Sequence, residues 1–437
     1  MPLFGTDGVR GVANRDLSPE LALAIGRAAG ESVGVGPILV GRDTCRSGDM
    51  LSAAFQAGVH SVGIDTVDVG VLPSGGIARL VAVGDATLGA VITASHNPAP
   101  DNGIKLLGRS GHKLSDEREA AIEARIEQGA PWVAPTGAAV GMAFPMPDAE
   151  ERYLGLLRDG FGFSLHGFSV VVDAAHGAAY KAGPDLLRAL GAEVEAIGTA
   201  PSGTNINEGC GATDTAALAR TADGRLGLAF DGDADRLIAI DEDGMVANGD
   251  VLMAVIARHL HDKGSLRNDT VVATVMSNLG FHKAMAEAGI NVVTTRVGDR
   301  YVVEALREHD GALGGEQSGH IIFPDRAPVG DGLLTALALL EVMAATGAPL
   351  TELRSVMTEY PQVLRNVRVG ESATLADSAD LWEEVSAVEQ RLGDEGRVLV
   401  RASGTEPLIR VMVEAASRDD ANELALHLCE VIRTELA

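Results

Sequence analysis

Cysteine, aromatic residues, positive charge and long hydrophobic runs are all scarce in this chain, and each scarcity excludes something. The three cysteines, Cys45, Cys210 and Cys429, are scattered and odd in number, which excludes a disulfide framework and a recognisable zinc motif. Aromatic residues make up 3% of the sequence, so the cores must be built mainly from Val, Leu, Ile and Ala. A reducing cytosol is the expected compartment.

Positive charge is scarce relative to negative charge. The 35 Lys and Arg residues face 61 Asp and Glu residues, which gives a formal net charge of −26 at pH 7. Nucleic acids and anionic membranes bind electropositive faces, so neither is an expected partner. Any site for a phosphate group must therefore be local.

No hydrophobic run reaches the length of a membrane span. The longest, residues 333–345, is interrupted by Glu341 and is predicted to be a buried helix. The N-terminus has neither the basic start nor the apolar core of a signal peptide. We therefore expect a cytoplasmic protein.

The chain contains a repeated alternation of strands and helices, typical of parallel α/β units. The elements predicted in three successive regions are helix 19–31, strand 38–40 and helix 51–59; strand 168–173, helix 184–190 and strand 193–197; and strand 271–276, helix 281–288 and strand 291–295. The C-terminal elements are strands 366–369, 397–400 and 409–413 with helices 381–392 and 420–436. We predict three related α/β domains with mixed sheets and a smaller C-terminal α+β domain, at residues 1–148, 149–250, 251–362 and 363–437.

Asp231, Asp233 and Asp235 follow the apolar run 226–230, which is predicted to be a buried strand. In an extended chain, side chains at alternate positions lie on one side, so these carboxylates are expected to converge. Converging carboxylates repel one another and resist ionisation unless a cation holds them together. The pattern favours a hard divalent cation over a plain polar turn, which does not explain the threefold repeat.

An EF-hand is the alternative metal site, because Glu242 is the twelfth residue counted from Asp231. Two features argue against it. Arg236 stands at the sixth position, where the sharp turn needs Gly, and the flanking segments are predicted to be strands and not helices. Three carboxylates at a strand end leave coordination positions that suit Mg²⁺ shared with a phosphate.

The segment 93–98 (TASHNP) follows a second apolar run, residues 88–92. Ser95 is therefore predicted at a strand end, exposed and able to react, although a serine that only caps a turn is the simpler interpretation of this loop alone. Beside the acidic segment, a phosphorylated serine next to a divalent metal would be a covalent phosphoryl donor. His96 and Lys105 could assist proton transfer, while ordinary structural roles for both remain open.

Two further polar segments have compositions that suit a phosphosugar. In residues 314–320 (GGEQSGH), Glu316 and Ser318 point the same way if the loop is extended, which would suit sugar hydroxyls. In residues 401–410 (RASGTEPLIR), two guanidinium groups, two hydroxyls and a glycine match the acceptors of a phosphate dianion. Simple surface turns remain the alternative for each segment.

Together with the opening segment FGTDGVRG, the segments TASHNP, DGDADR, GEQSGH and RASGTEPLIR resemble the motifs of the α-D-phosphohexomutases, in the same order and across the whole chain. In that family four domains contribute one loop each to a central cleft, and a phosphoserine exchanges its phosphoryl group with a phosphosugar. The opening segment, Gln317 and the segments 205–207 and 210–214 are most similar to the bacterial members that act on glucosamine phosphates. Residues 71–76 and His176 depart from the family pattern outside the chemical loops.

The resemblance implies a role for each matching residue. Ser95 would carry the phosphate and, with Asp231, Asp233 and Asp235, would bind one Mg²⁺ per chain. The groups around the transferring phosphate would be Arg10, His96, Lys105 and Arg236. The sugar would be bound by Glu316, Ser318, Arg236, Arg300 and His320, and the non-reacting phosphate by Arg401, Ser403, Gly404, Thr405 and Arg410.

The implied activity is the interconversion of glucosamine 6-phosphate and glucosamine 1-phosphate, which feeds UDP-N-acetylglucosamine and cell-wall precursor synthesis. Glucosamine 1,6-bisphosphate would be the intermediate and activator. The partner would be a small phosphosugar, and a homodimer is left open. Two alternatives also stay open: a mutase of the same family for glucose or mannose phosphates, and a non-catalytic relative that only binds a phosphosugar.

Overall fold

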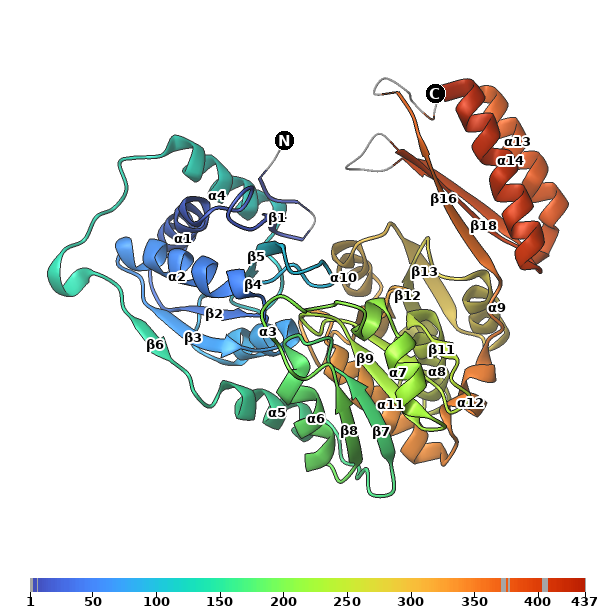
Figure 1. The fold of residues 1–437 in the computed structure, drawn as a ribbon, viewed down its shortest axis with the longest axis horizontal. Coiled ribbons are helices and arrows are strands. Elements are labelled where there is room, and N and C mark those ends of the chain that lie inside the picture. Colours follow the sequence, from blue (N-terminus) through green and yellow to red (C-terminus); the bar gives the residue numbers. More distant parts are fainter. Residues whose placement is uncertain (1–2, 6, 371–374, 376–377, 403–407, 437) are drawn as a thin grey trace. The chain divides into compact units, whose positions relative to one another are not determined.

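The computed structural model describes residues 3–5, 7–370, 375, 378–402 and 408–436 (Figure 1). The chain divides into two compact units, one made of residues 1–276 and 290–355 and the other of residues 277–289 and 356–437. The first unit contains three α/β sheets, and the second contains one antiparallel sheet.

The N-terminal region has the longest run of alternating elements. These are β1 (Val9–Val12), α1 (Pro19–Val33), β2 (Ile38–Arg42), α2 (Arg46–Ser61), β3 (Thr66–Val71), α3 (Ser74–Val83), β4 (Leu88–Ile92), β5 (Asp101–Gly108), α4 (Asp116–Gln128) and β6 (Ala143–Pro145). The strand order is β1-β5-β4-β2-β3-β6. The sheet is mixed, because β5 runs antiparallel to β4 and β1 whereas β2 is parallel to β3 and β4.

Alternation along β2 explains how both faces of this sheet are covered. Ile38 and Val40 are fully buried in a core cluster with residues of α1 and α2. On the opposite face, a side chain at Gly41 would come within 2.5 Å of Ile77 of α3. Glycine at this position therefore leaves room for the side chains of Ile77 and Val69.

The second region contains α5 (Ala149–Asp159), β7 (Ser169–Asp173), α6 (Ala179–Ala189), β8 (Glu193–Ile197), α7 (Ala216–Ala222), β9 (Leu226–Phe230), β10 (Leu237–Ile240) and β11 (Val246–Ala247). The strand order is β11-β10-β9-β7-β8, with β7 parallel to β8 and β9, and β10 antiparallel to β9. Helix α6 begins at Ala179, so the helix start predicted near Pro184 is wrong. Proline favours a first turn, but here it lies inside the helix, where Ala182 and Leu186 bury the same face.

The third region contains α8 (Gly249–Asp262), β12 (Thr270–Thr274), β13 (Asn291–Thr295), α10 (Asp299–Glu308), β14 (Leu313–Gly315), β15 (Ile321–Ile322), α11 (Gly332–Thr346) and α12 (Leu350–Leu353). The strand order is β13-β12-β14-β15, parallel except for β15. Helix α11 confirms the predicted buried helix: Asp331 caps its start by accepting the Leu334 N–H at 3.1 Å, and Gly347 ends it at φ +70°.

Within the described residues, no single helix is long and apolar enough to cross a membrane. Helix α11 and the segment Leu350–Val356, which meet at a bend of 92°, meet the criteria of length and composition only as a pair.

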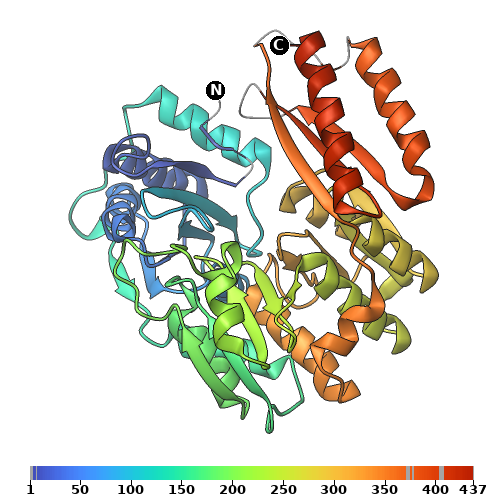
Figure 2. The same ribbon diagram turned by 45° about the vertical axis from the view of Figure 1, so that its right-hand side comes forward.

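The second unit contains α9 (Leu279–Glu287), β16 (Gln362–Arg368), α13 (Ala379–Leu392), β17 (Arg397–Ala402), β18 (Leu408–Glu414) and α14 (Arg418–Leu436). Its sheet has the order β16-β18-β17 and is antiparallel throughout. Figures 1 and 2 show α13 and α14 side by side on one face of this sheet. Leu424, Leu428 and Ile432 of α14 are buried there in one apolar stripe. The predicted fold class, three α/β domains with mixed sheets and a smaller α+β domain, is thereby confirmed.

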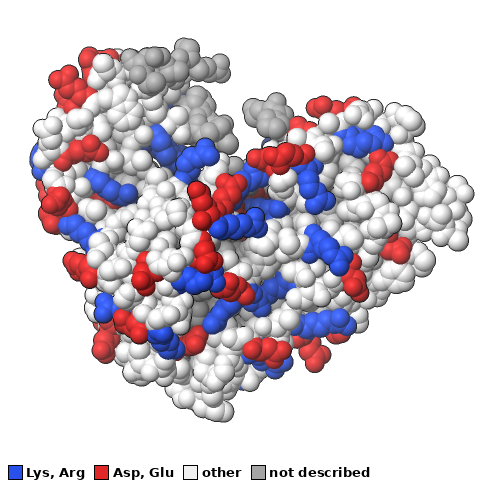
Figure 3. Space-filling view, turned by 180° about the vertical axis from the view of Figure 1, so that it is seen from behind, with Lys and Arg blue, Asp and Glu red and all other residues white. Residues whose placement is uncertain are grey.

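Charged side chains of both signs lie interspersed on the face shown in Figure 3. Surface ion pairs such as Arg258 Nε to Asp262 Oδ1, at 3.0 Å, are typical of this arrangement. Such exposed pairs contribute at most about 1 kcal/mol each. The fold is therefore held mainly by its apolar cores.

Candidate active site

Ser95 lies in the loop that follows strand β4. Its φ is +56°, in the left-handed region that residues with a Cβ seldom occupy. Thr93 holds this conformation, because its Oγ1 accepts the Ser95 N–H at 2.9 Å and donates to Asp43 Oδ2 at 2.7 Å. Ser95 is only 2% exposed, so the prediction of an exposed serine is wrong. Its Oγ donates a hydrogen bond to the buried Asp231 Oδ2 at 2.7 Å.

The three aspartates of the acidic segment lie between β9 and β10. Carboxylate oxygens of Asp231, Asp233 and Asp235 all lie within 4.8 Å of one another, and all three side chains are buried. The carboxylates therefore converge as predicted, but the predicted cause is wrong. The segment forms a turn, with Ala234 at φ +57°, and does not continue strand β9 in extended form.

The burial of these carboxylates favours a bound cation. Burial, reinforced by the charges of Asp235 and Asp233, holds the pKa of Asp231 well above its usual range. Among the described residues, Asp233 Oδ1 and Asp235 Oδ1 are buried without a hydrogen-bond partner. Clustered carboxylate oxygens are the ligands that Mg²⁺ and other hard cations prefer. The cluster can therefore hold a metal ion.

Lys105, on strand β5, lies directly beside the acidic cluster. Its Nζ is 3.2 Å from Asp233 Oδ2, 3.6 Å from Asp235 Oδ2 and 3.1 Å from Asp7 Oδ2. Burial disfavours the ammonium charge, but the three carboxylates together outweigh it and hold the pKa of Lys105 well above its usual range. Lys105 is thus a fixed positive charge near the Ser95 loop.

The two histidines of the site, His96 and His320, differ in charge. Burial, helped by two nearby arginines, lowers the pKa of His96 to about 4, and its Nδ1 lies 3.4 Å from Ser95 Oγ. Burial also disfavours charge on His320, but Asp235, 3.4 Å from its Nδ1, and other carboxylates raise the pKa of His320 to about 9. At neutral pH His96 is therefore a neutral proton acceptor beside Ser95, whereas His320 is a cation.

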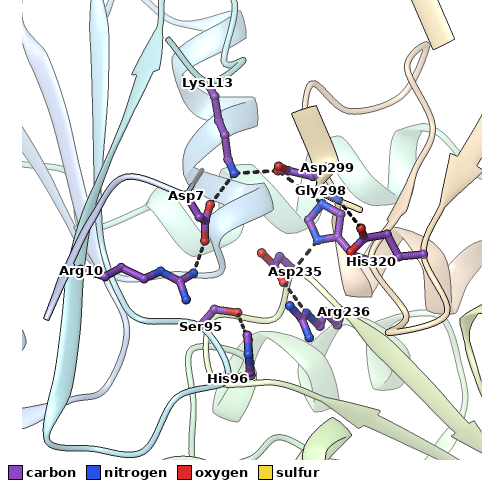
Figure 4. Close-up of a pocket in the computed structure, with 11 residues that line it drawn as sticks. Asp7, Arg10, Ser95, His96, Lys113, Asp235, Arg236, Gly298, Asp299 and His320 are labelled. Atoms are coloured by element: carbon purple, nitrogen blue, oxygen red, sulfur yellow. Dashed lines mark hydrogen bonds and ion pairs between the residues drawn. The ribbon is translucent and has the colours of Figure 1, made fainter. Parts of the chain in front are cut away.

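These groups surround a cavity of about 210 Å³ in the first unit (Figure 4). The lining residues come from all three α/β regions: Asp7, Arg10, Ser95, His96, Lys113, Asp235, Arg236, Gly298, Asp299, Glu316 and His320. Figure 4 shows the side chains of Arg10 and His320 reaching in from opposite sides. The lining combines cations, carboxylates and hydroxyl or imidazole groups, which suits a hydroxylated ligand whose anionic part contacts the cations.

Two residues predicted to bind the sugar, Ser318 and Arg300, lie outside this lining. Ser318 belongs to a tight turn, in which the Gly319 N–H donates to Glu316 O at 3.0 Å and Ser318 Oγ lies 3.4 Å from Glu316 Oε2. Arg300 pairs with Asp116 and Glu119 and lines a neighbouring cavity of about 150 Å³.

Arg401 and Arg410 in the second unit are direct neighbours on the antiparallel strands β17 and β18. Both Nε atoms are buried, and neither has a hydrogen-bond partner among the described residues. Burial and the charge of Arg410 lower the pKa of Arg401. Adjacent guanidinium groups of this kind favour an anion between or beside them. The other predicted phosphate ligands, Ser403, Gly404 and Thr405, lie outside the described residues.

Several polar residues of the site were not predicted from the sequence. Lys113 Nζ contacts Asp7 and lies 2.7 Å from Asp299 Oδ2. Ser74, the first residue of α3, donates from its Oγ to Asp233 Oδ2 at 2.7 Å. Asp7 could have been found, because it belongs to the opening motif FGTDGVRG. The others are single polar residues in loops or at a helix start, where no periodic pattern marks them.

Four family models match the chain in sequence order. Their descriptions are phosphoglucomutase/phosphomannomutase alpha/beta/alpha domains I, II and III and the C-terminal domain. They match residues 1–131, 162–244, 248–360 and 364–431. The domain boundaries proposed from the sequence stay a prediction.

Proteins named phosphoglucosamine mutase are similar to this chain over its full length. The protein of Pelotomaculum thermopropionicum is 50% identical and covers 99% of both chains. That of Rhodococcus opacus is 51% identical, over 98% of this chain and 99% of the relative.

Solved structures of related proteins have the same fold. A putative phosphomannomutase from Thermus thermophilus has a TM-score of 0.80 at 25% identity, over 98% of both chains. Aspergillus fumigatus N-acetylphosphoglucosamine mutase, solved with GlcNAc-6P and magnesium, has a TM-score of 0.71 at 18% identity, over 99% of this chain and 95% of that one. At that identity the second likeness concerns the fold alone.

Proposed function

This chain belongs to the phosphoglucomutase/phosphomannomutase family, the α-D-phosphohexomutases, and from that premise we propose that it interconverts glucosamine 6-phosphate and glucosamine 1-phosphate. Relatives named for this activity are 50% to 51% identical to it over nearly all of both chains. The proposed mechanism uses a phosphorylated Ser95 and a glucosamine 1,6-bisphosphate intermediate. We further propose that the enzyme is cytoplasmic. Whether it forms a homodimer is a question for a measurement of its mass in solution.

The observation that carries the proposal is the contact between the nucleophile and the acidic cluster. Ser95 Oγ lies 2.7 Å from Asp231 Oδ2, although the two residues are far apart in sequence and belong to different α/β regions. A serine that only capped a turn would gain nothing from such a buried carboxylate. A serine that carries a phosphoryl group beside a cation-binding cluster has the parts of a phosphotransfer site.

We propose that Asp231, Asp233, Asp235 and the phosphorylated Ser95 hold one Mg²⁺. When bound, the ion would neutralise negative charge on the phosphoryl group in transit. The chain itself would supply further positive charge through Arg10, Lys105 and Arg236.

The two transfers are related by symmetry. In the first, the bond between Ser95 Oγ and phosphorus breaks and a new bond forms from phosphorus to O1 of glucosamine 6-phosphate. The O1 hydroxyl loses its proton and Ser95 Oγ gains one, and His96 is the neutral group placed to exchange that proton with Ser95. The bisphosphate then turns end for end, and Ser95 Oγ takes the phosphoryl group from O6, which leaves glucosamine 1-phosphate.

Recognition has to serve both orientations of the bisphosphate. We propose that Glu316, Ser318, Arg300 and His320 bind the sugar. The phosphate that does not react would be bound by Arg401 and Arg410, together with Ser403, Gly404 and Thr405. Two neighbouring guanidinium groups without described partners support this assignment.

A substrate panel tests the proposal. Turnover of glucosamine, glucose and mannose 1-phosphates should be compared at equal concentration, and the phosphorylation of Ser95 should be measured in the same purified enzyme. We expect the highest kcat/KM with glucosamine 1-phosphate. A higher kcat/KM with glucose or mannose phosphate would assign the chain to another activity of the family, and no turnover together with an unphosphorylated Ser95 would leave only a binding protein.

A further inference from the structure

Asn207 lies in the loop that follows strand β8, within the segment Asn205–Asn207 that resembles one branch of the family but has no assigned role. Its φ is +58°, and its backbone N–H donates to Ala175 O at 3.0 Å. Its side chain reaches from the second α/β region to the first. The Nδ2 atom donates to Ser95 O at 2.9 Å and to Asn97 O at 3.0 Å, so one amide group binds two carbonyls of the Ser95 loop.

The Ser95 loop needs such restraints. A residue with a Cβ is disfavoured in the left-handed region, and Ser95 is held there at φ +56°. Thr93 restrains the N–H side of Ser95 from within the first region. Asn207 restrains the carbonyl side from the second region. The conformation of the reactive residue is therefore fixed by contacts on both of its peptide groups.

The same amide also touches the loop of the acidic cluster. A Cβ at Gly232 would lie 2.4 Å from Ser95 O and 2.7 Å from Asn207 Nδ2. The Gly232 carbonyl in turn accepts the Ala178 N–H at 2.7 Å. Three loops therefore meet at one point, and only glycine fits at position 232. Asn207 therefore contacts both the loop of Ser95 and the loop of Asp231.

We propose that Asn207 is a positioning residue, which ties the Ser95 loop to the acidic cluster and so sets the approach of Ser95 Oγ to Asp231. The inference rests on the proposed function of Ser95 as the phosphoryl carrier. Loss of the Asn207 amide should lower kcat, because Ser95 Oγ would be misplaced. It should leave the KM for the phosphosugar nearly unchanged, because Asn207 is not part of the cavity lining.

Asn205 provides a matched control two residues earlier in the same loop. Its Oδ1 accepts the Ser202 N–H at 2.7 Å and its Nδ2 donates to Ala200 O at 3.1 Å, so both bonds stay within the loop. Asn207→Gly deletes the amide and keeps the left-handed backbone accessible. Asn205→Gly makes the same deletion without breaking the tie to Ser95.

The experiment measures kcat and KM together with amide hydrogen exchange of the peptide that contains residues 93–98. For Asn207→Gly we expect kcat to fall about ten- to a hundredfold, as for misplacement of a reacting group by about 1 Å, with KM within about twofold of wild type. Exchange in the Ser95 peptide should become faster. Asn205→Gly should leave both measurements at wild-type values.

Asn207→Asp provides a second variant of the same shape if the glycine variant does not fold. The carboxylate donates no hydrogen bond and would face two carbonyl oxygens, so its kcat should be at or below that of Asn207→Gly. A wild-type kcat and wild-type exchange in an Asn207 variant, or equal losses in Asn205→Gly, would overturn the inference. If the wild-type protein has no mutase activity, the proposed function fails, and exchange still decides whether Asn207 holds the loop.

Discussion

The Ser95 region and the pair of arginines on β17 and β18 differ in how their charges are balanced. Around Ser95, the ammonium of Lys105 faces Asp7, Asp233 and Asp235 within 3.6 Å. On β17 and β18, Arg401 and Arg410 face each other, and neither Nε has a described partner. The first region is organised by the protein's own contacts, whereas the second needs an anion to balance it.

We therefore expect the Ser95 region to serve the chemical step and the arginine pair to serve ligand binding. A substitution around Ser95 removes a contact that the folded protein already makes, so it should change the chemical step, metal binding or stability. A substitution of Arg401 or Arg410 removes like-charge repulsion, so it should weaken ligand binding without a loss of stability. The following predictions test that separation, from the largest expected effect to the smallest.

Ser95→Ala should fold and lose mutase activity by at least about a thousandfold, because it deletes the covalent carrier of the phosphoryl group. Ser110→Ala is the matched control, because Ser110 lies in an exposed turn of the same region and should keep wild-type turnover. Activity is measured with phosphate-free reagents. More than a few per cent of wild-type activity in Ser95→Ala would contradict the role of this serine.

Asp233→Asn should weaken the binding of Mg²⁺ by about ten- to a hundredfold, since it removes one negatively charged carboxylate of three. Calorimetric titration of the metal into wild type and variant measures the change. The control is Asp243→Asn, an exposed aspartate of the same region. Superimposable titrations of wild type and Asp233→Asn would show that the cation binds elsewhere.

Arg410→Ala should lower kcat/KM by about ten- to a hundredfold in both reaction directions. A charge-assisted hydrogen bond to phosphate contributes about 1.5–3 kcal/mol. The melting temperature of Arg410→Ala should stay level or rise, because the repulsion between Arg410 and Arg401 is removed.

Arg397→Ala on the same sheet should instead lower stability, because it removes the ion pair of Arg397 Nε with Glu414 Oε2 at 2.6 Å. We expect that variant to melt at a lower temperature and to keep its kcat/KM. A defect of Arg410→Ala in one reaction direction alone would mean that the strand pair binds only one orientation of the bisphosphate.

Asp43→Asn should change the pH dependence of stability. Burial, partly offset by hydrogen bonds from the Thr93 hydroxyl and the Cys45 N–H, raises the pKa of Asp43 from 3.8 to about 6. The folded state then binds more protons than the unfolded state between these values. The stabilising contribution is fully present below pH 3.8 and is lost as the pH rises through about 6.

The free energy of unfolding of wild type should therefore fall by about 2 kcal/mol more than that of Asp43→Asn between pH 4 and pH 7. Urea titrations at several pH values measure this difference. Asp85→Asn, at an exposed position of the same region, should match wild type. Parallel curves for wild type and Asp43→Asn would show that Asp43 is not buried in its acidic form beneath the Ser95 loop.

The sequence predicted the strands and the loops of the site, because short apolar runs such as residues 88–92 and 226–230 mark buried strands and polar residues follow them. It could not predict the conformation of these loops. Ser95 and Ala234 occupy the left-handed region, which their residue types disfavour, so tertiary contacts decide. The burial of Ser95 likewise depends on Asp231, which is distant in sequence.

Ion pairs between single charged residues also could not be predicted from the sequence. Lys113 and Asp299 lie in different α/β regions, and no periodic pattern connects them. Helix α6 illustrates the limit of local signals, because Pro184 is usually a sign of a helix start and here lies inside a helix. Such residues are placed by packing that only the whole fold defines.

The mass of the Ser95 peptide tests the central claim most directly. The account predicts that purified protein carries one phosphate, about 80 Da, on the peptide containing Ser95. Phosphatase should remove the phosphate, and glucosamine 1,6-bisphosphate should restore it in wild type but not in Ser95→Ala. A Ser95 peptide that never gains this mass, in a protein that still turns over glucosamine phosphates, would contradict the account.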